Sequence, residues 1–105
     1  MNYMTPAELS EKLNANNDVV LLDIRESYEL EICQIGGLHI PMGDISTRVN
    51  EINSDFEVAV LCRSGKRAEA VANFLETDAG MKKVAIVAGG ILAWIDTIDS
   101  SLEAY

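Results

Sequence analysis

The chain has 105 residues, enough for one compact domain, and 49% of them are hydrophobic, which supplies apolar surface for a core. A formal net charge of -9 at pH 7 excludes nucleic acid and anionic membrane surfaces as expected partners, because both are bound through clustered lysine and arginine. No apolar run approaches the roughly 18 residues of a membrane span, and the first residues lack the features of a secretion signal. We therefore expect a single domain over residues 1–105 in the cytoplasm.

The first half of the chain predicts two helices and two strands. The sequence "TPAE" at Thr5 to Glu8 is a capping box with proline at the first helical position, and it predicts a helix to about Asn14. Residues 19–24, "VVLLDI", are apolar without alternation, as in a strand buried on both faces of a parallel sheet. Next, "ESYELEI" is typical of a short helix, and "GGLHIP" of a turn that leads into a brief strand.

The second half continues the alternation of strands and helices. Residues 44–52, "DISTRVNEI", predict a helix, and both "VAVLC" at 58–62 and "KVAIV" at 83–87 predict buried strands. The apolar sides of the three expected helices are Ile45, Val49 and Ile52; Ala68, Val71, Ala72 and Leu75; and Ile91, Trp94, Ile95 and Ile98. Gly80 ends the second of these regions, and Gly89 and Gly90 form a turn before the last helix. The pattern predicts an α/β fold with a central, mostly parallel sheet.

Cys62 directly follows a predicted strand, at the edge of the sheet where open α/β folds bind ligands. Gly65 supplies the conformational freedom for a tight loop, whose backbone N–H groups then form a nest for an anion. Arg63, Lys66 and Arg67 are three of the eight basic residues, and at a helix N-terminus they oppose the helix dipole. A solvated helix start therefore explains these cations poorly.

Such surroundings favour a nucleophilic thiolate at Cys62 and would hold a persulfide, a phosphate ester or an arsenate adduct. The alternative is that Cys62 is a small buried hydrophobic residue that ends a strand. The glycine and the cations favour the reactive interpretation. Cys33 and Cys62 are expected to be free thiols. No metal or other cofactor is expected, because His39 is the only histidine and no cluster has ligand spacing.

The chain resembles the single-domain rhodanese (sulfurtransferase) family. The matching segments, in the order of the family, are "LLDIRE" at 21–26, "LHIP" at 38–41, "LCRSGKRA" at 61–68 and "GGILAW" at 89–94. The resemblance implies a three-layer domain with a central, mostly parallel five-stranded sheet flanked by helices. It also implies that Cys62 takes sulfur from an anionic donor such as thiosulfate or a persulfide and carries it as a persulfide. Cys62 then passes the sulfur to cyanide or to a thiol, and a protein thiol is one candidate acceptor.

The resemblance also assigns roles to individual residues. Arg63, Ser64, Gly65, Lys66 and Arg67 complete the active loop: Arg63 and Lys66 are the expected contacts of the donor anion, and Arg67 orients the loop. Asp23 and Arg25, which match the "D-x-R" pattern of the family, are expected to form buried ion pairs that support the site. His39 and Trp94 are expected to be structural.

The length of the loop separates sulfur transfer from related chemistry. Cys62 to Arg67 is a C-x4-R spacing, which in this superfamily goes with sulfur transfer, whereas phosphatases and arsenate reductases have C-x5-R. A further alternative is a module that binds or regulates a partner without turnover, although such a module would not need the cysteine and the cations. The physiological donor, the acceptor and the oligomeric state are not determined by the sequence.

Two positions depart from the pattern of the family. Where the family commonly has glycine and histidine, this chain has Cys33 and Gln34. The histidine is generally structural, so the change is expected to affect local packing more than activity. Cys33 is either a resolving thiol or an incidental free thiol, and we favour the second interpretation.

Overall fold

The computed structural model describes residues 2–15 and 18–105, and its centre is a five-stranded sheet. The strands are β1 (Asn2–Met4), β2 (Val19–Asp23), β3 (Leu38–His39), β4 (Glu57–Leu61) and β5 (Val84–Val87). Their order across the sheet is β1-β5-β4-β2-β3, and each adjacent pair is parallel. The expected α/β fold with a parallel five-stranded sheet is thus confirmed.

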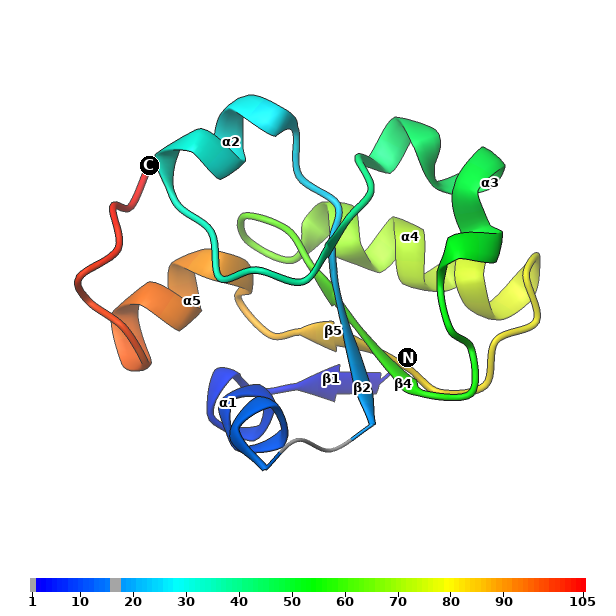
Figure 1. Cartoon of the computed structure of the whole chain (residues 1–105), viewed down its shortest axis with the longest axis horizontal. Coiled ribbons are helices and arrows are strands. Elements are labelled where there is room, and N and C mark those ends of the chain that lie inside the picture. The colour runs from blue at the N-terminus through cyan, green and yellow to red at the C-terminus, as the bar shows by residue number, and fades with distance from the viewer. Residues whose placement is uncertain (1, 16–17) are drawn as a thin grey trace.

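Helices cover both faces of this sheet, as Figure 1 shows. In that view α3 (Ile45–Arg48) and α4 (Lys66–Thr77) lie above the sheet, α1 (Pro6–Asn14) lies below it and α5 (Gly90–Thr97) lies to its left. Residues of α1 and α5 belong to the same core. The remaining helix, α2 (Ser27–Ile32), lies near the carboxyl ends of the strands, beside the end of the chain. Among the described residues, no helix is both long and apolar enough to cross a membrane.

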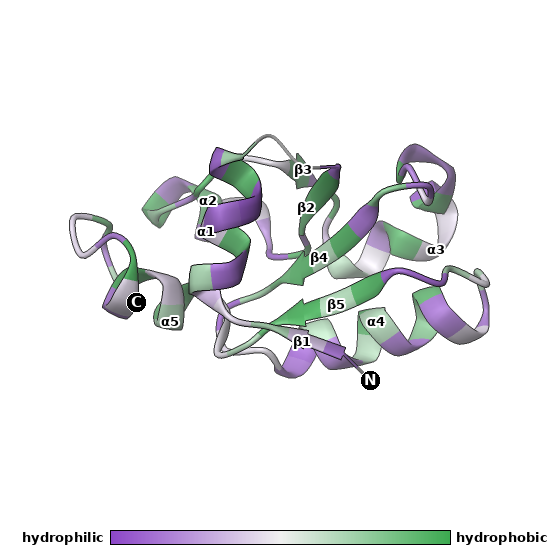
Figure 2. Cartoon of the chain, turned by 90° about the horizontal axis from the view of Figure 1, so that it is seen from below, coloured by the Kyte–Doolittle hydropathy of each residue, from purple (hydrophilic) through white to green (hydrophobic). Residues whose placement is uncertain are grey.

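The three central strands β2, β4 and β5 each contribute to two hydrophobic cores, one on either face of the sheet. Along β4, Val58 and Val60 belong to the core beneath α3 and α4, whereas Ala59 and Leu61 belong to the core beneath α1 and α5. These three strands are therefore hydrophobic along most of their length and mostly green in Figure 2, whereas the edge strand β1 is purple to pale. Burial on both faces explains why the sequence of these strands does not alternate between apolar and polar residues.

Two helices form as their sequence patterns predict. In α1, the Thr5 hydroxyl accepts a hydrogen bond from the Glu8 N–H, and the Glu8 carboxylate accepts one from the Thr5 N–H. This reciprocal capping box fixes the first turn after Pro6. In α4, the four residues of the predicted apolar side are all buried: Ala68, Val71, Ala72 and Leu75.

The prediction of one continuous helix over residues 44–52 is wrong. The structure divides the segment from 42 to 52 into a 3₁₀ turn at Met42–Asp44, the short helix α3, and a second 3₁₀ turn at Val49–Glu51. The Thr47 hydroxyl donates to the carbonyl of Asp44, serine and threonine favour such local contacts over helix, and so short a segment gains little from cooperative helix growth. Ile45 and Ile52 are nevertheless buried, so the predicted apolar side is correct.

Two smaller features also differ from what the residues predict. The sequence does not predict the edge strand β1, because it has three residues and two of them are exposed. The helical spacing predicts Ile98 on the apolar side of the last helix, but α5 ends at Thr97 and Ile98 is 37% exposed. Both differences lie at the periphery of the fold, where short segments carry little periodic pattern.

Candidate active site

The loop after β4 curls around the sulfur of Cys62, which is 1% exposed. The Sγ atom accepts hydrogen bonds from the backbone N–H of Gly65, at 3.0 Å, and of Ala68, at 3.4 Å. Gly65 has a φ of 111°, in the left-handed region that favours glycine, and α4 begins at the next residue. The sulfur therefore faces backbone donors and the positive end of a twelve-residue helix, which together stabilise negative charge.

The first turn of α5 fixes the same loop from its other side. Ile91 N–H donates to the carbonyl of Cys62 at 2.9 Å, and Leu92 N–H donates to the carbonyl of Arg63 at 3.2 Å. In a trans peptide the C=O and N–H groups point in opposite directions, so the N–H groups that follow these carbonyls point away from α5. Gly90 permits this approach, since a Cβ atom there would lie 2.4 Å from the carbonyl oxygen of Arg63.

Arg67, at the end of the loop, is held by a buried carboxylate from α2. Its Nη1 and Nη2 atoms lie 2.8 Å from the two carboxylate oxygens of Glu29, which is 2% exposed. The hydrogen bonds from Arg67 lower the pKa of Glu29 to about 2. The pKa of Arg67 is in turn raised, mainly by Glu29 and to a smaller extent by Cys62. Both partners therefore stay charged at neutral pH, and this two-point contact anchors the loop.

A second ion pair lies behind the loop, between Arg25 and Asp23. Both residues are buried, and Arg25 Nη2 lies 2.9 Å from Asp23 Oδ2 and 2.9 Å from the carbonyl oxygen of Cys33. The backbone carbonyl of Arg25 lies 2.6 Å from Nε2 of His39. The pair is thus hydrogen-bonded on several sides, as a buried ion pair requires. His39 makes the structural contact that was expected of it.

Tyr105 connects the two ion pairs. Its hydroxyl donates to Glu29 Oε1 at 2.8 Å and accepts a hydrogen bond from Arg25 Nη1 at 3.0 Å. The Arg63 and Arg25 guanidinium carbons lie 5.1 and 5.9 Å from the centre of its ring. Arg63 Nη2 also donates to the backbone oxygen of Tyr105. Figure 1 shows how this contact arises, because the chain after α5 returns along the side of the molecule and ends beside α2.

The predicted site residues thus fall into an exposed and a buried group. Arg63, Ser64 and Lys66 are exposed, while Asp23 and Arg25 are buried behind the loop. Cys33 is a free thiol in the core beneath α1 and α5, whereas Cys62 belongs to the core on the opposite face. This placement fits the interpretation of Cys33 as an incidental free thiol.

Sequence reasoning missed Glu29 and Tyr105. Glu29 is one of several acidic residues on a short helix, and it is 38 positions from Arg67. Tyr105 is 76 positions from Glu29 and lies outside any periodic segment. One argument could have indicated Glu29: a charged arginine at the end of the loop, Arg67, needs an acidic partner where it is removed from water.

Comparisons with known proteins agree with this geometry. A family model described as "Rhodanese-like domain" matches residues 5–97. A sulfurtransferase of Allochromatium vinosum (strain ATCC 17899) is 36% identical over 95 residues, which are 90% of this chain and 88% of that protein. YrkF of Bacillus subtilis (strain 168) is 36% identical over 85 residues, 80% of this chain but only 45% of YrkF. The chain thus spans less than half of this second relative.

A solved structure shows the same architecture over the whole chain. The rhodanese-like domain protein from Staphylococcus aureus superposes with a TM-score of 0.82 and is 29% identical. The match covers 100% of this chain and 99% of the other.

Proposed function

The chain belongs to the rhodanese-like domain family, and we propose that it is a sulfurtransferase that carries sulfane sulfur as a persulfide on Cys62. The observation that carries the proposal is the pair of backbone N–H groups, from Gly65 and Ala68, that donate to the Cys62 sulfur. Donors placed around a sulfur stabilise a thiolate, and they stabilise an anionic persulfide in the same loop.

The proposed reaction consists of two nucleophilic displacements at sulfur. The Cys62 thiolate attacks the outer sulfur of thiosulfate, the S–S bond of the donor breaks, and sulfite leaves with the bonding electron pair. The new S–S bond leaves a persulfide anion on Cys62. Cyanide or a thiolate acceptor then attacks the terminal sulfur and regenerates the Cys62 thiolate. A persulfide donor would react in the same way and release a thiolate.

The residues around the loop would have different roles in this reaction. Arg63 and Lys66 are exposed cations that would attract an anionic donor toward the sulfur. Arg67 and its partner Glu29 would keep the loop closed around the persulfide. The burial of Cys62 would limit the access of water to the sulfur.

The C-x4-R loop also supports sulfur transfer over phosphate chemistry. It contains one residue fewer than the loops of the related phosphatases and arsenate reductases. A tetrahedral phosphoryl or arsenate group held on Cys62 would need more room than the single outer sulfur atom of a persulfide. The domain is proposed to extend over residues 1–105, to act in the cytoplasm, and to need no metal or other cofactor.

The test is the intact mass of the purified protein after incubation with thiosulfate and then with cyanide. We expect the wild type to gain the mass of one sulfur atom and to lose it to cyanide with release of thiocyanate. Cys62→Ser should gain nothing, because it lacks the nucleophile. Cys33→Ser is the matched control, and it should load as the wild type does because Cys33 lies in the other core.

Two outcomes would change the proposal. Loading by glutathione persulfide but not by thiosulfate would keep the reaction and change the donor. If neither donor loads the wild type, sulfur transfer is excluded under these conditions and a binding module becomes the leading hypothesis.

A further inference from the structure

Tyr105 makes more contacts with the charged groups of the site than its distance in the sequence suggests. Its hydroxyl lies between Arg25 and Glu29, and its ring lies against Arg63. Three different parts of the residue, the hydroxyl, the ring and the backbone oxygen, each meet a charged side chain. A residue that only filled space would not need this set of polar contacts.

The hydroxyl of Tyr105 completes the buried part of the site. It donates to the same carboxylate oxygen of Glu29 that Arg67 Nη2 contacts, and it accepts from Arg25. Burial and the Glu29 carboxylate raise the pKa of Tyr105. The hydroxyl therefore stays protonated at neutral pH and can donate this hydrogen bond.

The ring and the backbone oxygen act on Arg63, the exposed residue next to the nucleophile. The guanidinium carbon of Arg63 lies 5.1 Å from the centre of the ring, within the range of a cation–π contact. The hydrogen bond to the backbone oxygen uses one of five N–H donors, and others remain for a ligand. The ring carries no net charge, so its cation–π contact restrains Arg63 without neutralising the guanidinium.

We propose that Tyr105 is a positioning residue that holds the Arg63 guanidinium beside the Cys62 loop and so raises the affinity for a small anionic sulfur donor. This inference rests on the proposed sulfurtransferase function. An unrestrained surface arginine loses side-chain freedom when it binds an anion. An arginine that is already held in place loses less, so its contacts with the anion yield more affinity.

The first test compares thiosulfate:cyanide kinetics of four variants. Arg63→Ala should raise the KM for thiosulfate about tenfold, as for the loss of a charged hydrogen bond. Tyr105→Leu should raise it about fivefold with kcat within about twofold of the wild type, because positioning acts on donor binding. The double variant should match Arg63→Ala, since Tyr105 acts through Arg63. Tyr105→Phe keeps the ring, so its KM should stay within about twofold of the wild type.

A second test does not depend on sulfur transfer. Alkylation of Cys62 by iodoacetate and by iodoacetamide is followed by peptide mass spectrometry, and the ratio of the two rates is taken. Access to the thiol cancels in this ratio, which then measures attraction of the anionic reagent. The ratio should fall in Arg63→Ala and Tyr105→Leu and stay near the wild-type value in Tyr105→Phe.

Tyr28→Leu is the matched control, because Tyr28 is 63% exposed and the substitution is the same. It should leave both KM and the alkylation ratio unchanged. The proposal is overturned if Tyr105→Leu leaves both quantities at their wild-type values, or if its effect adds in full to that of Arg63→Ala. If kcat falls in Tyr105→Leu while the alkylation ratio does not change, the role is structural and the proposal also fails.

The two proposals can fail separately. A wild type that forms no thiocyanate would contradict the sulfurtransferase function, and the alkylation ratios would still decide the coupling of Tyr105 to Arg63. If Tyr105→Leu does not fold, the comparison of wild type, Tyr105→Phe and Arg63→Ala remains. In that case a ratio in Tyr105→Phe as low as in Arg63→Ala would overturn the role of the ring.

Discussion

Glu29 is the residue that balances the positive charge at the end of the Cys62 loop. Its two carboxylate oxygens accept hydrogen bonds from Arg67, from the Tyr105 hydroxyl and from the backbone N–H of Glu26. Glu29 itself is almost fully buried, whereas Arg67 and Tyr105 are partly exposed. Removal of the carboxylate would leave three donors without this partner, and the loss of hydrogen bonds to a charged group is costly.

The lowered pKa of Glu29 makes a prediction for stability against pH. The folded-state pKa is about 2, below the ordinary value of 4.5, so the native state favours the ionised carboxylate. This stabilisation, about 3 kcal/mol, is complete above pH ~4.5 and is lost as the pH falls toward 2. The wild type should therefore be more stable than Glu29→Gln at pH 6, and urea unfolding should show the difference shrinking toward pH 2.

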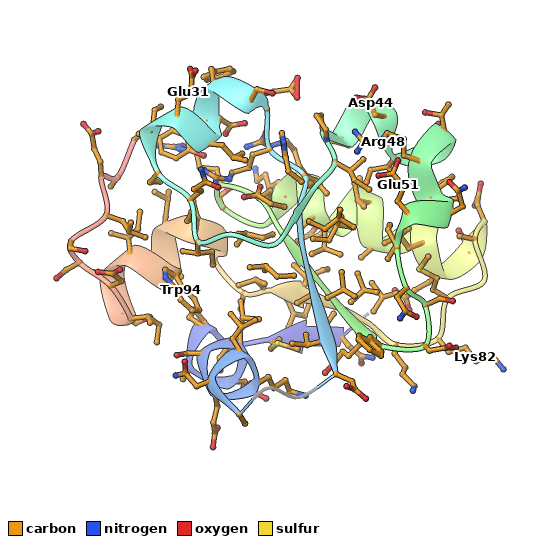
Figure 3. All side chains as sticks on the ribbon, viewed as in Figure 1. Glu31, Asp44, Arg48, Glu51, Lys82 and Trp94 are labelled. Carbon is orange, nitrogen blue, oxygen red and sulfur yellow. The ribbon has the colours of Figure 1, made fainter. Side chains whose placement is uncertain are left out.

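Glu51→Gln is the control for this experiment. Glu51 pairs with Arg48 on the surface, as the labelled side chains in Figure 3 show, and both residues are exposed to solvent. Surface pairs contribute little, so Glu51→Gln should differ little from the wild type at any pH. A constant gap between wild type and Glu29→Gln from pH 6 to pH 2 would contradict the assigned role of Glu29.

Among single residues, the sequence indicates candidates that stand in a local pattern and misses those that reach the loop through the fold. Cys62 and Gly65 are candidates because a strand end, a glycine and nearby cations occur within a few positions. Glu29 and Tyr105 reach the loop only through the tertiary structure, and neither stands in a local pattern. The distinction is physical, since a buried charge is revealed by its partner and not by its own neighbours in sequence.

Among the contacts between elements, that of α5 with the Cys62 loop leaves no room for a side chain at Gly90. Gly90 has a φ of 62°, and a Cβ atom there would meet the backbone of Arg63 and Cys62. Gly90→Ala should therefore displace the loop and slow persulfide loading more than about tenfold, with a loss of about 1 to 3 kcal/mol in unfolding free energy. Loading followed by intact mass measures the first effect, and urea unfolding measures the second.

Gly80→Ala separates strain from steric clash. Gly80 has a similar φ of 70°, but a Cβ atom there would extend into open space, with no contact within 4 Å. It should lose about 1 kcal/mol through backbone strain and load sulfur at the wild-type rate. If Gly90→Ala also loads at the wild-type rate, close approach of α5 does not shape the loop.

Elements with a strong period were predicted well, and short ones were not. The helix with the buried side at Ala68 to Leu75 repeats its pattern over two turns, so its position followed from sequence. Residues 44–52 carry an apolar side but poor helix formers, and the structure breaks the segment into turns. For β1 the decisive factor is pairing with β5 at the sheet edge, which three residues do not encode locally.

For the molecule as a whole, the parallel sheet separates two hydrophobic cores, one on each face. Ile86 on β5 lies in the core beneath α3 and α4, and Ile91 on α5 lies in the core on the other face. Both side chains are fully buried. A packing defect on one face of the sheet should therefore have little effect on packing in the other core.

Ile86→Val and Ile91→Val should each lower the unfolding free energy by about 0.5 to 1.5 kcal/mol. The loss of unfolding free energy in the double variant should equal the sum of the two single losses within about 0.5 kcal/mol, because the two sites share no core.

The contrasting pair is Ile86→Val with Val60→Ala. Val60 is paired with Ile86 in the register of β4 and β5 and lies in the same core. That pair should depart from additivity, because one cavity relaxes into the other. Urea unfolding with a common m-value measures all of these, and strong coupling between Ile86 and Ile91 would show that packing is transmitted through the sheet.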